Sequence, residues 1–270
     1  AALFSIRFFD CLPFSGFTRT FNYETVSTLA SFLIYAAEPF SFPLGVIKGL
    51  TFPFEDANVG NVGALALFAV GVKAIGKVFP YFQTFDYFVL VEIVSCFLTA
   101  FFAQKILVTL GVSRTAFRVL GALLMGTSFL LLTRSAWHQP FCVVSFPIFT
   151  AWIYAMLLTL QRGQWRLRQD VAIVSIFPIA ALTDNYSLVG ILLGTGVLLA
   201  RESFEAVFGG LSASRNRFSR MLFFCVGGVA LSILCLYMIG MFPLPPVPKT
   251  FTSYDFGIGG RYHGADFFAP

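Results

Sequence analysis

Six apolar segments, with most of the arginines between them, limit what this chain can form more than any other feature. A helix rises 1.5 Å per residue, so about 20 apolar residues cross the roughly 30 Å hydrocarbon core of a bilayer. Charged residues make up 11% of the chain, against about 25% in soluble domains. The pattern predicts an all-α, polytopic transmembrane bundle of about six or seven spans, six of them at 86–110, 119–133, 140–160, 171–183, 186–200 and 220–241.

A further apolar segment, 62–79, decides the orientation of the bundle. Lys73 and Lys77 lie on one face of a helix there, which favours a helix in the interface with both amines reaching water. If this segment does not cross, every arginine-rich turn falls on one side, which the positive-inside rule makes cytoplasmic. The arginines concerned are Arg114, Arg118, Arg162, Arg166, Arg168, Arg201, Arg215, Arg217 and Arg220. The net charge of +5 is then a topology signal, so we expect membrane lipids and no nucleic acid as partners.

One transmembrane domain over residues 1–270 is therefore expected. Its parts are an outer juxtamembrane region of loops and helices, the helical bundle and an outer loop, at 22–80, 86–241 and 242–270. A helix is predicted over 22–38, with Glu24 in its first turn, where a carboxylate suits the helix dipole. Because the chain begins at Ala1 inside an apolar run and ends abruptly, we expect a longer protein at both ends.

The only adjacent acidic pair in the sequence, Glu55-Asp56, stands among phenylalanine, proline and glycine. Bare charge in an apolar setting costs about several kcal/mol, so the pair indicates water, a polar ligand or a divalent cation nearby. Together with Glu24, these carboxylates are candidates for a general base or a cation site at the membrane surface. The alternative is a hydrated loop charge paired to Lys48 or Lys73.

Arg134 and His138 form a second candidate, in TRSAWHQP at the outer end of a predicted span. An outward arginine runs against the positive-inside tendency. With a histidine one helical turn later it could hold phosphate or pyrophosphate, which guanidinium binds bidentately. The alternative is an interfacial anchor, since tryptophan and snorkelling arginine are common at membrane surfaces.

Two other turns carry polar residues that could line one cavity together with Arg134 and His138. Asp184 follows the short span 171–183, which Pro178 is expected to interrupt, and short, kinked segments often border a cavity. A helix cap is the alternative for Asp184. Arg261 and His263 stand in GGRYHG, where glycine permits close approach of the backbone.

The sequence lacks the known motifs of several enzyme classes, which argues against those classes. The sequence has no Walker loop, dinucleotide-binding fingerprint, zinc-protease motif, nucleophile elbow, or haem or iron–sulfur pattern. The five cysteines lie in or beside apolar runs without metal-ligand spacing, which predicts free thiols. Glu92, inside a span, is expected to face the bundle interior and to pair with Lys73 or Lys77.

Seven short segments occur in a characteristic order along the chain. They are FPLG (42–45), FEDANVG (54–60), KVFPYF (77–82), SRTAFRVLGALL (113–124), TRSAWHQPF (133–141), ALTDNYSLVG (181–190) and FGIGGRYHGADFFAP (256–270). In this order they resemble a family of uncharacterised bacterial multi-pass membrane proteins of the GT-C glycosyltransferase type. The resemblance implies a bacterial inner-membrane protein with a lipid-linked sugar donor and transfer on the extracytoplasmic side.

The resemblance also implies roles for the candidate residues. An acidic residue in the first outer loop, matched best by Glu24 and then by Asp56, activates the acceptor hydroxyl, and Arg134 with His138 binds the phosphate. Members of this type more often have aspartate at the first position. The alternative hypothesis is a non-catalytic structural subunit of a larger membrane complex, whose Phe-rich helices pack against other membrane subunits. The two differ in whether these four side chains converge on one water-filled pocket.

Overall fold

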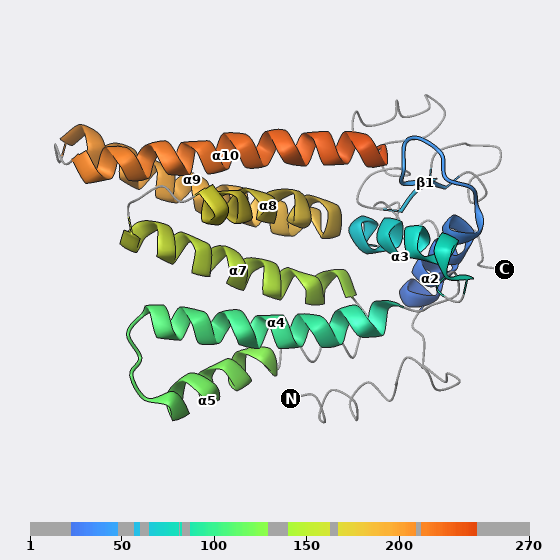
Figure 1. Ribbon diagram of the computed structural model, residues 1–270, viewed down its shortest axis with the longest axis horizontal. Coiled ribbons are helices and arrows are strands. Elements are labelled where there is room, and N and C mark those ends of the chain that lie inside the picture. Colours follow the sequence, from blue (N-terminus) through green and yellow to red (C-terminus); the bar gives the residue numbers. More distant parts are fainter. Residues whose placement is uncertain are drawn as a thin grey trace. The chain divides into compact units, whose positions relative to one another are not determined.

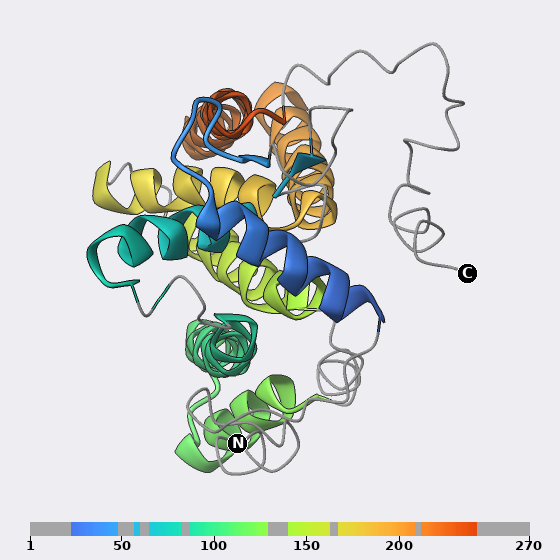
Figure 2. The ribbon, with the colours of Figure 1, turned by 90° about the vertical axis from the view of Figure 1, so that its right-hand side faces the viewer.

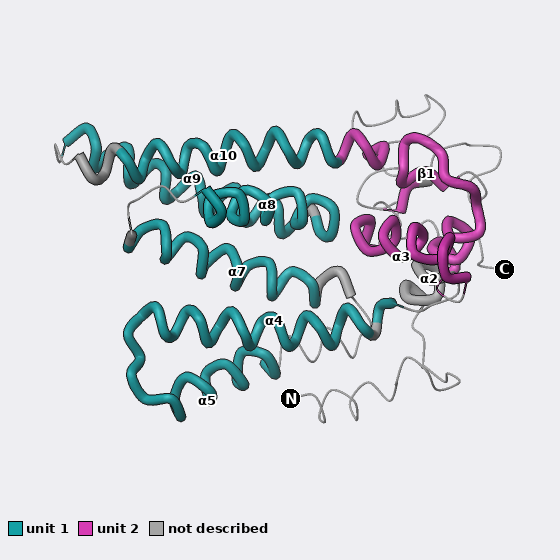
Figure 3. The backbone as a smooth tube through the Cα atoms, viewed as in Figure 1, with its two compact units in different colours: residues 1–17, 87–235 teal, residues 18–86, 236–270 magenta. Residues whose placement is uncertain are grey.

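The computed structural model describes residues 23–47, 57–59, 65–80, 82, 87–128, 140–162, 167–208 and 212–241. In this part of the chain, regular structure is helical apart from two strands of two residues each. The chain divides into two compact units (Figure 3), unit 1 with residues 1–17 and 87–235 and unit 2 with residues 18–86 and 236–270. The prediction of an all-helical protein is confirmed.

Unit 1 is a helical bundle. Its described helices are α4 (Tyr87–Thr109), α5 (Thr115–Gly126), α7 (Pro140–Arg162), α8 (Leu167–Thr183), α9 (Asn185–Phe208) and all but the last turn of α10 (Ser212–Ile239). The C-terminal ends of α4, α7 and α9 lie at one end of the bundle together with the first turns of α5, α8 and α10, and the α8–α9 turn lies at the other (Figure 1). Viewed nearly along the helices, α4 lies between α5 and α7, and it contacts both (Figure 2).

Four helices of the described part are long and apolar enough to cross a membrane. The qualifying segments are Leu90–Thr109, Val143–Gln161, Tyr186–Phe208 and Asn216–Ile239. By contrast, α5 has 12 residues and α8 has 17, about 18 and 26 Å of helix, which is less than the hydrocarbon core. The structure therefore supports an integral membrane protein with four candidate spans, and the count of six or seven stays a prediction.

The expected interruption at Pro178 is wrong, because α8 continues through this residue from Leu167 to Thr183. Pro178 is buried, and the neighbouring Phe177 packs against Gly228 of α10. Membrane helices tolerate internal proline where adjacent helices support the backbone. Packing against α10 thus keeps α8 continuous where the sequence alone suggested a break.

Small residues allow α7 and α9 to approach closely. Gly190 and Gly194 stand one turn apart on α9, and a Cβ at Gly190 would lie 2.6 Å from Cζ of Phe149. A Cβ at Gly194 would overlap the Trp152 ring. The Trp152 indole N–H donates a 3.1 Å hydrogen bond to Oγ1 of Thr195. Close approach and an interhelical hydrogen bond are the usual means by which helices associate in lipid.

Unit 2 contains α2 (Tyr23–Ala37), α3 (Ala66–Val78) and an antiparallel pair of strands, β1 (Val46–Ile47) and β2 (Ala57–Asn58). The helix predicted over 22–38 is confirmed by α2. With 13 residues, α3 is about 20 Å long, which is too short to cross and supports the prediction that 62–79 does not span the membrane. The core of unit 2 is formed by Phe32, Tyr35, Ile47, Val59, Leu65 and Ala69.

The C-terminal turn of α10 belongs to unit 2, whose loop satisfies its carbonyl groups. The backbone N–H groups of Leu44 and Gly45 donate to the carbonyls of Met238 and Ile239, at 2.9 and 3.1 Å. The amide of Asn58 donates to the Ile239 carbonyl as well. Because the last carbonyls of a helix lack partners within the helix, these bonds anchor the loop before β1 to the end of α10.

Candidate functional site

Asp184 is the predicted site residue whose side chain the structure describes. It lies in the turn between α8 and α9, 9% exposed. Its Oδ1 accepts a 3.2 Å bond from the backbone N–H of Tyr186. Its Oδ2 accepts bonds from the N–H of Ser187 at 3.1 Å, from the Ser187 hydroxyl at 2.8 Å and from the Ser145 hydroxyl of α7 at 2.7 Å.

This geometry makes Asp184 the N-cap of α9. A carboxylate at a helix N-terminus accepts the free amides and is stabilised by the positive end of the dipole. The negative charge of a capping aspartate opposes direct contact with a phosphate. Oδ1 accepts only one of the four hydrogen bonds, so it can accept a further bond from a sugar hydroxyl. The cap explains Asp184 structurally, and its role in substrate binding stays a prediction.

The Ser145–Asp184 bond also places the beginning of α7 beside the α8–α9 turn. Both lie at the end of unit 1 away from the arginine-containing turns (Figure 1). Two predicted site residues, Arg134 and His138, precede α7 in the sequence and lie outside the described residues. Hydrogen bonds therefore hold the Asp184 carboxylate and the hydroxyl groups of Ser145 and Ser187 together at this end.

The other predicted residues are not brought together by the described structure. Glu24 falls in the first turn of α2, in unit 2, and its side chain is outside the described part. The described residues also do not include Glu55, Asp56, Arg261 and His263. Among the described side chains, no group of three histidine, cysteine, aspartate or glutamate residues could hold a metal ion. This result does not test a cation at Glu55 and Asp56.

Sequence reasoning missed a buried ion pair in unit 1. Arg220 Nη2 lies 2.6 Å from Oδ1 of Asp170, and the two side chains are 1% and 3% exposed. The sequence pattern predicts Arg220 in a basic loop, but α10 begins at Ser212, so this arginine lies two turns inside the helix. The signal that could have revealed the pair is Asp170 itself, an acid in the first turn of α8 at the arginine-rich end.

A second group of charges follows at the same end of the bundle. Arg217 Nε lies 2.8 Å from Oε2 of Glu202, and its Nη2 lies 3.4 Å from Oε2 of Glu205. Arg201 pairs with Glu205 along α9 at 3.0 Å. Paired charges on α9 and α10 therefore join these helices.

The prediction that both lysines of α3 reach water is wrong for Lys73. Lys77 is exposed, but Lys73 is 2% exposed. Its Nζ lies 3.7 Å from the centre of the Tyr35 ring, 5.0 Å from that of Phe40 and 3.4 Å from the carbonyl oxygen of Pro39. Lys73 is thus a cation held on aromatic faces in the core of unit 2.

Burial changes the acidity of both partners in this contact. It lowers the pKa of the Lys73 amine from an ordinary 10.5 to about 8, although Glu38 acts in the opposite direction. Burial, followed by the charge of Glu38, raises the pKa of Tyr35 to about 12. The Tyr35 hydroxyl donates to the carbonyl of Leu44. At neutral pH the contact is therefore between an ammonium and a neutral phenol.

Taken together, the apolar helices and the capped polar turn define a helical membrane protein. Residues 2–261 match a family described as a domain of unknown function, DUF6311. Because the match covers nearly the whole chain, the protein belongs to this family. No curated protein and no solved structure matches the chain.

Proposed function

We propose that this protein is a membrane glycosyltransferase-like enzyme that transfers a sugar from a polyprenyl-phosphate carrier on the extracytoplasmic side. The observation that supports it most is the polar turn at one end of unit 1, where the Asp184 carboxylate bonds to Ser145 of α7. Arg134 and His138 directly precede α7 in the sequence, so we expect them at the same end. A carboxylate beside cationic groups is what binding of a sugar phosphate requires.

The orientation of the protein in the membrane is part of the proposal. Most of the arginines belong to the helix ends that share one end of unit 1 (Figure 1). The positive-inside rule places this end in the cytoplasm. The α8–α9 turn then faces the extracytoplasmic side, where a polyprenyl-linked sugar would be used.

The proposed reaction is a single displacement. The carboxylate of Glu24 or Asp56 removes the proton from the acceptor hydroxyl as its oxygen attacks the anomeric carbon of the donor sugar. The bond between that carbon and the phosphate oxygen breaks, and polyprenyl phosphate leaves with both electrons of the bond. Arg134 and His138, with Arg261, stabilise the charge that develops on the phosphate. A divalent cation held by the acidic pair would add to this stabilisation.

The test uses membranes that contain the full protein. Undecaprenyl phosphate carrying radiolabelled glucose or mannose serves as the donor, and label transferred to membrane glycan is measured. We expect Glu24→Ala or Asp56→Ala to reduce transfer at least about a hundredfold, the scale of general base catalysis. Glu205→Gln, at the arginine-rich end, is the matched control and should retain transfer. Unchanged transfer in both alanine variants, at equal protein levels, would remove the mechanism.

The alternative is a non-catalytic structural subunit of a larger membrane complex. It is favoured by the capping of Asp184, because four hydrogen bonds within the protein explain this carboxylate without a ligand. This alternative predicts that the protein is recovered from membranes only with other subunits. Recovery of an active single chain would exclude it.

A further inference from the structure

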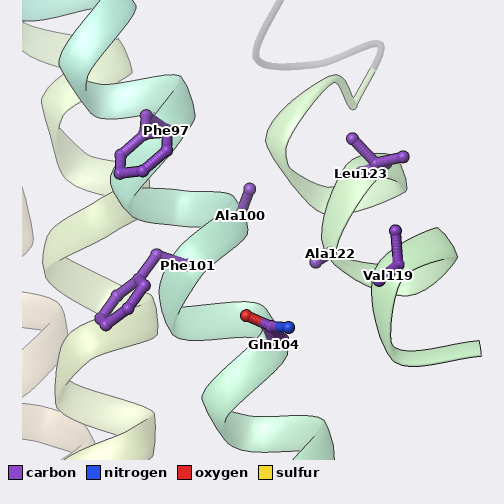
Figure 4. Close-up of a pocket in the computed structure, with 7 residues that line it drawn as sticks. All are labelled: Phe97, Ala100, Phe101, Gln104, Val119, Ala122 and Leu123. Atoms are coloured by element: carbon purple, nitrogen blue, oxygen red, sulfur yellow. The ribbon is translucent and has the colours of Figure 1, made fainter. Parts of the chain in front are cut away.

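A groove between α4 and α5 lies on the described surface of unit 1. Its volume is about 200 Å³. Its lining is apolar except for one amide and consists of Phe97, Ala100, Phe101, Gln104, Val119, Ala122 and Leu123. Figure 4 shows Ala100 and Gln104 on the side of α4 that faces α5, with Val119, Ala122 and Leu123 opposite. The groove has no role in the proposed sugar transfer.

The groove is open at the described surface of unit 1. Phe97 is 70% exposed and Leu123 is 42% exposed, and α4 is a candidate span at this position. The two helices touch where glycine permits it, since a Cβ at Gly126 would lie 2.7 Å from that of Ala100. Because α5 ends after 12 residues, it covers part of α4 only. The apolar walls at this depth therefore face hydrocarbon chains.

Cationic side chains gather where the groove approaches the arginine-rich end. Lys105 follows Gln104 on α4, and its Nζ lies 5.3 Å from the centre of the Phe101 ring. Arg118 precedes Val119 on α5 and donates to Oγ1 of Thr115 at 2.9 Å. Its Nε is buried and has no hydrogen-bond partner among the described residues. One end of the groove is thus positively charged.

No acidic residue near in the sequence balances these cations. Between Glu92 and Asp170 the sequence contains neither aspartate nor glutamate. The ion pairs found in the described part of this end use Arg201, Arg217 and Arg220 instead. An apolar groove whose positive end forms no ion pair with a described carboxylate matches an amphiphile that has an anionic head.

We propose that this groove binds one acyl chain of an anionic phospholipid, with the headgroup phosphate against Lys105 and Arg118. The chain covers the walls of the groove, and the phosphate supplies the missing negative charge, which guanidinium binds bidentately. A second copy of this protein would fill the groove with apolar surface but bring the same positive charge to it. The site lies toward the arginine-rich end, so it is separate from the sugar-transfer face.

The first experiment measures lipid preference. The full protein is purified in detergent micelles containing equal amounts of dioleoyl phosphatidylglycerol and dioleoyl phosphatidylcholine, and native mass spectrometry counts the lipids that stay bound. The wild type is expected to retain phosphatidylglycerol preferentially. Each cation near anionic lipid contributes about fivefold in affinity, so Lys105→Gln with Arg118→Gln should lower the preference about 25-fold. Arg168→Gln, an exposed cation at the start of α8, is the matched control and should leave the preference unchanged.

The second experiment fills the groove. Leu123→Trp places an indole in the groove, whereas Leu124→Trp adds the same volume at a neighbouring position of α5 that is 63% exposed and does not line it. We expect retention of both lipids to fall for Leu123→Trp alone, with unchanged helix content. Equal retention of the two lipids by the wild type would overturn the proposal. So would identical behaviour of the two tryptophan variants, or a change from dimer to monomer on filling the groove.

Discussion

The buried ion pair between Asp170 and Arg220 leads to the sharpest prediction about stability. The paired atoms are 2.6 Å apart and both side chains are almost fully buried. At an effective dielectric constant of about 20 and a charge separation of about 4 Å, the attraction is about 4 kcal/mol. Removing one partner leaves the other charge in the interior, which costs about 3–5 kcal/mol. Asp170→Asn and Arg220→Met should each lower the free energy of unfolding by this amount.

The assay is unfolding of the full protein in mixed micelles with increasing sodium dodecyl sulfate, followed by tryptophan fluorescence. The double variant, Asp170→Asn with Arg220→Met, removes both charges of the pair. It should therefore lose less than the sum of the single losses, with a coupling free energy of about 2–3 kcal/mol. Arg201→Gln is the control, since Arg201 pairs with Glu205 at an exposed position, and should cost less than about 1 kcal/mol.

The predicted losses in unfolding free energy require that water does not reach the pair inside the protein. If each single variant costs less than about 1 kcal/mol, or if the losses add without coupling, water reaches the pair and the burial argument is refuted. Equal losses for Arg201→Gln and Arg220→Met would have the same meaning, because burial is the main difference between the two arginines.

Three further predictions follow from single contacts. Lys73 binds its proton less tightly when folded, so the stability of the protein should rise as pH increases from about 8 to 10.5; Lys73→Met should remove this rise in thermal unfolding and be more stable below pH 8. Gly194→Val should destabilise by about 1–3 kcal/mol through overlap with Trp152, whereas Gly196→Val, at an open position, should not lower the melting temperature. Asp184→Ala should cost about 0.5–2 kcal/mol by removing the cap of α9, measured by the same detergent titration against Asp184→Asn, which retains capping ability.

The long helices could be predicted because their constraint is local. A backbone in hydrocarbon must satisfy its hydrogen bonds within the helix, so the apolar run 86–110 gives nearly the bounds of α4, Tyr87–Thr109. The C-terminal ends of two helices could also be predicted, because each is followed by a glycine. Gly111 and Gly240 adopt positive φ angles of 83° and 80° directly after α4 and α10, the conformation that terminates helices at glycine.

The side-chain contacts could not be predicted, because they depend on how each helix is rotated against its neighbours. Asp170 and Arg220 are 50 positions apart, and nothing in either segment specifies that they face one another. Lys73 could equally have snorkelled to water, as Lys77 does, until α2 placed the Tyr35 ring beneath its amine. Asp184 was recognisable as a cap or a ligand; its bonds to the backbone N–H groups of α9 show the cap, and a role in ligand binding stays a prediction.

The cations in the described part of the arginine-rich end fall into two groups, those that pair with a described carboxylate and those that do not, and the sequence alone does not distinguish them. The arginines at 201, 217 and 220 are balanced by Asp170, Glu202 and Glu205, so they stabilise the packing of α8, α9 and α10. The positive-inside rule counts lysine and arginine and gives carboxylates little weight, whereas attraction of an anionic lipid depends on the cations that no carboxylate pairs with. In the described part these include Lys105, Arg114 and Arg118, which belong to α4, α5 and the turn between them. The same unbalanced charges support both the orientation of the bundle and the anionic lipid in the α4–α5 groove. A preference for anionic lipid that vanishes with Lys105 and Arg118 would thus strengthen the assignment of this end to the cytoplasm.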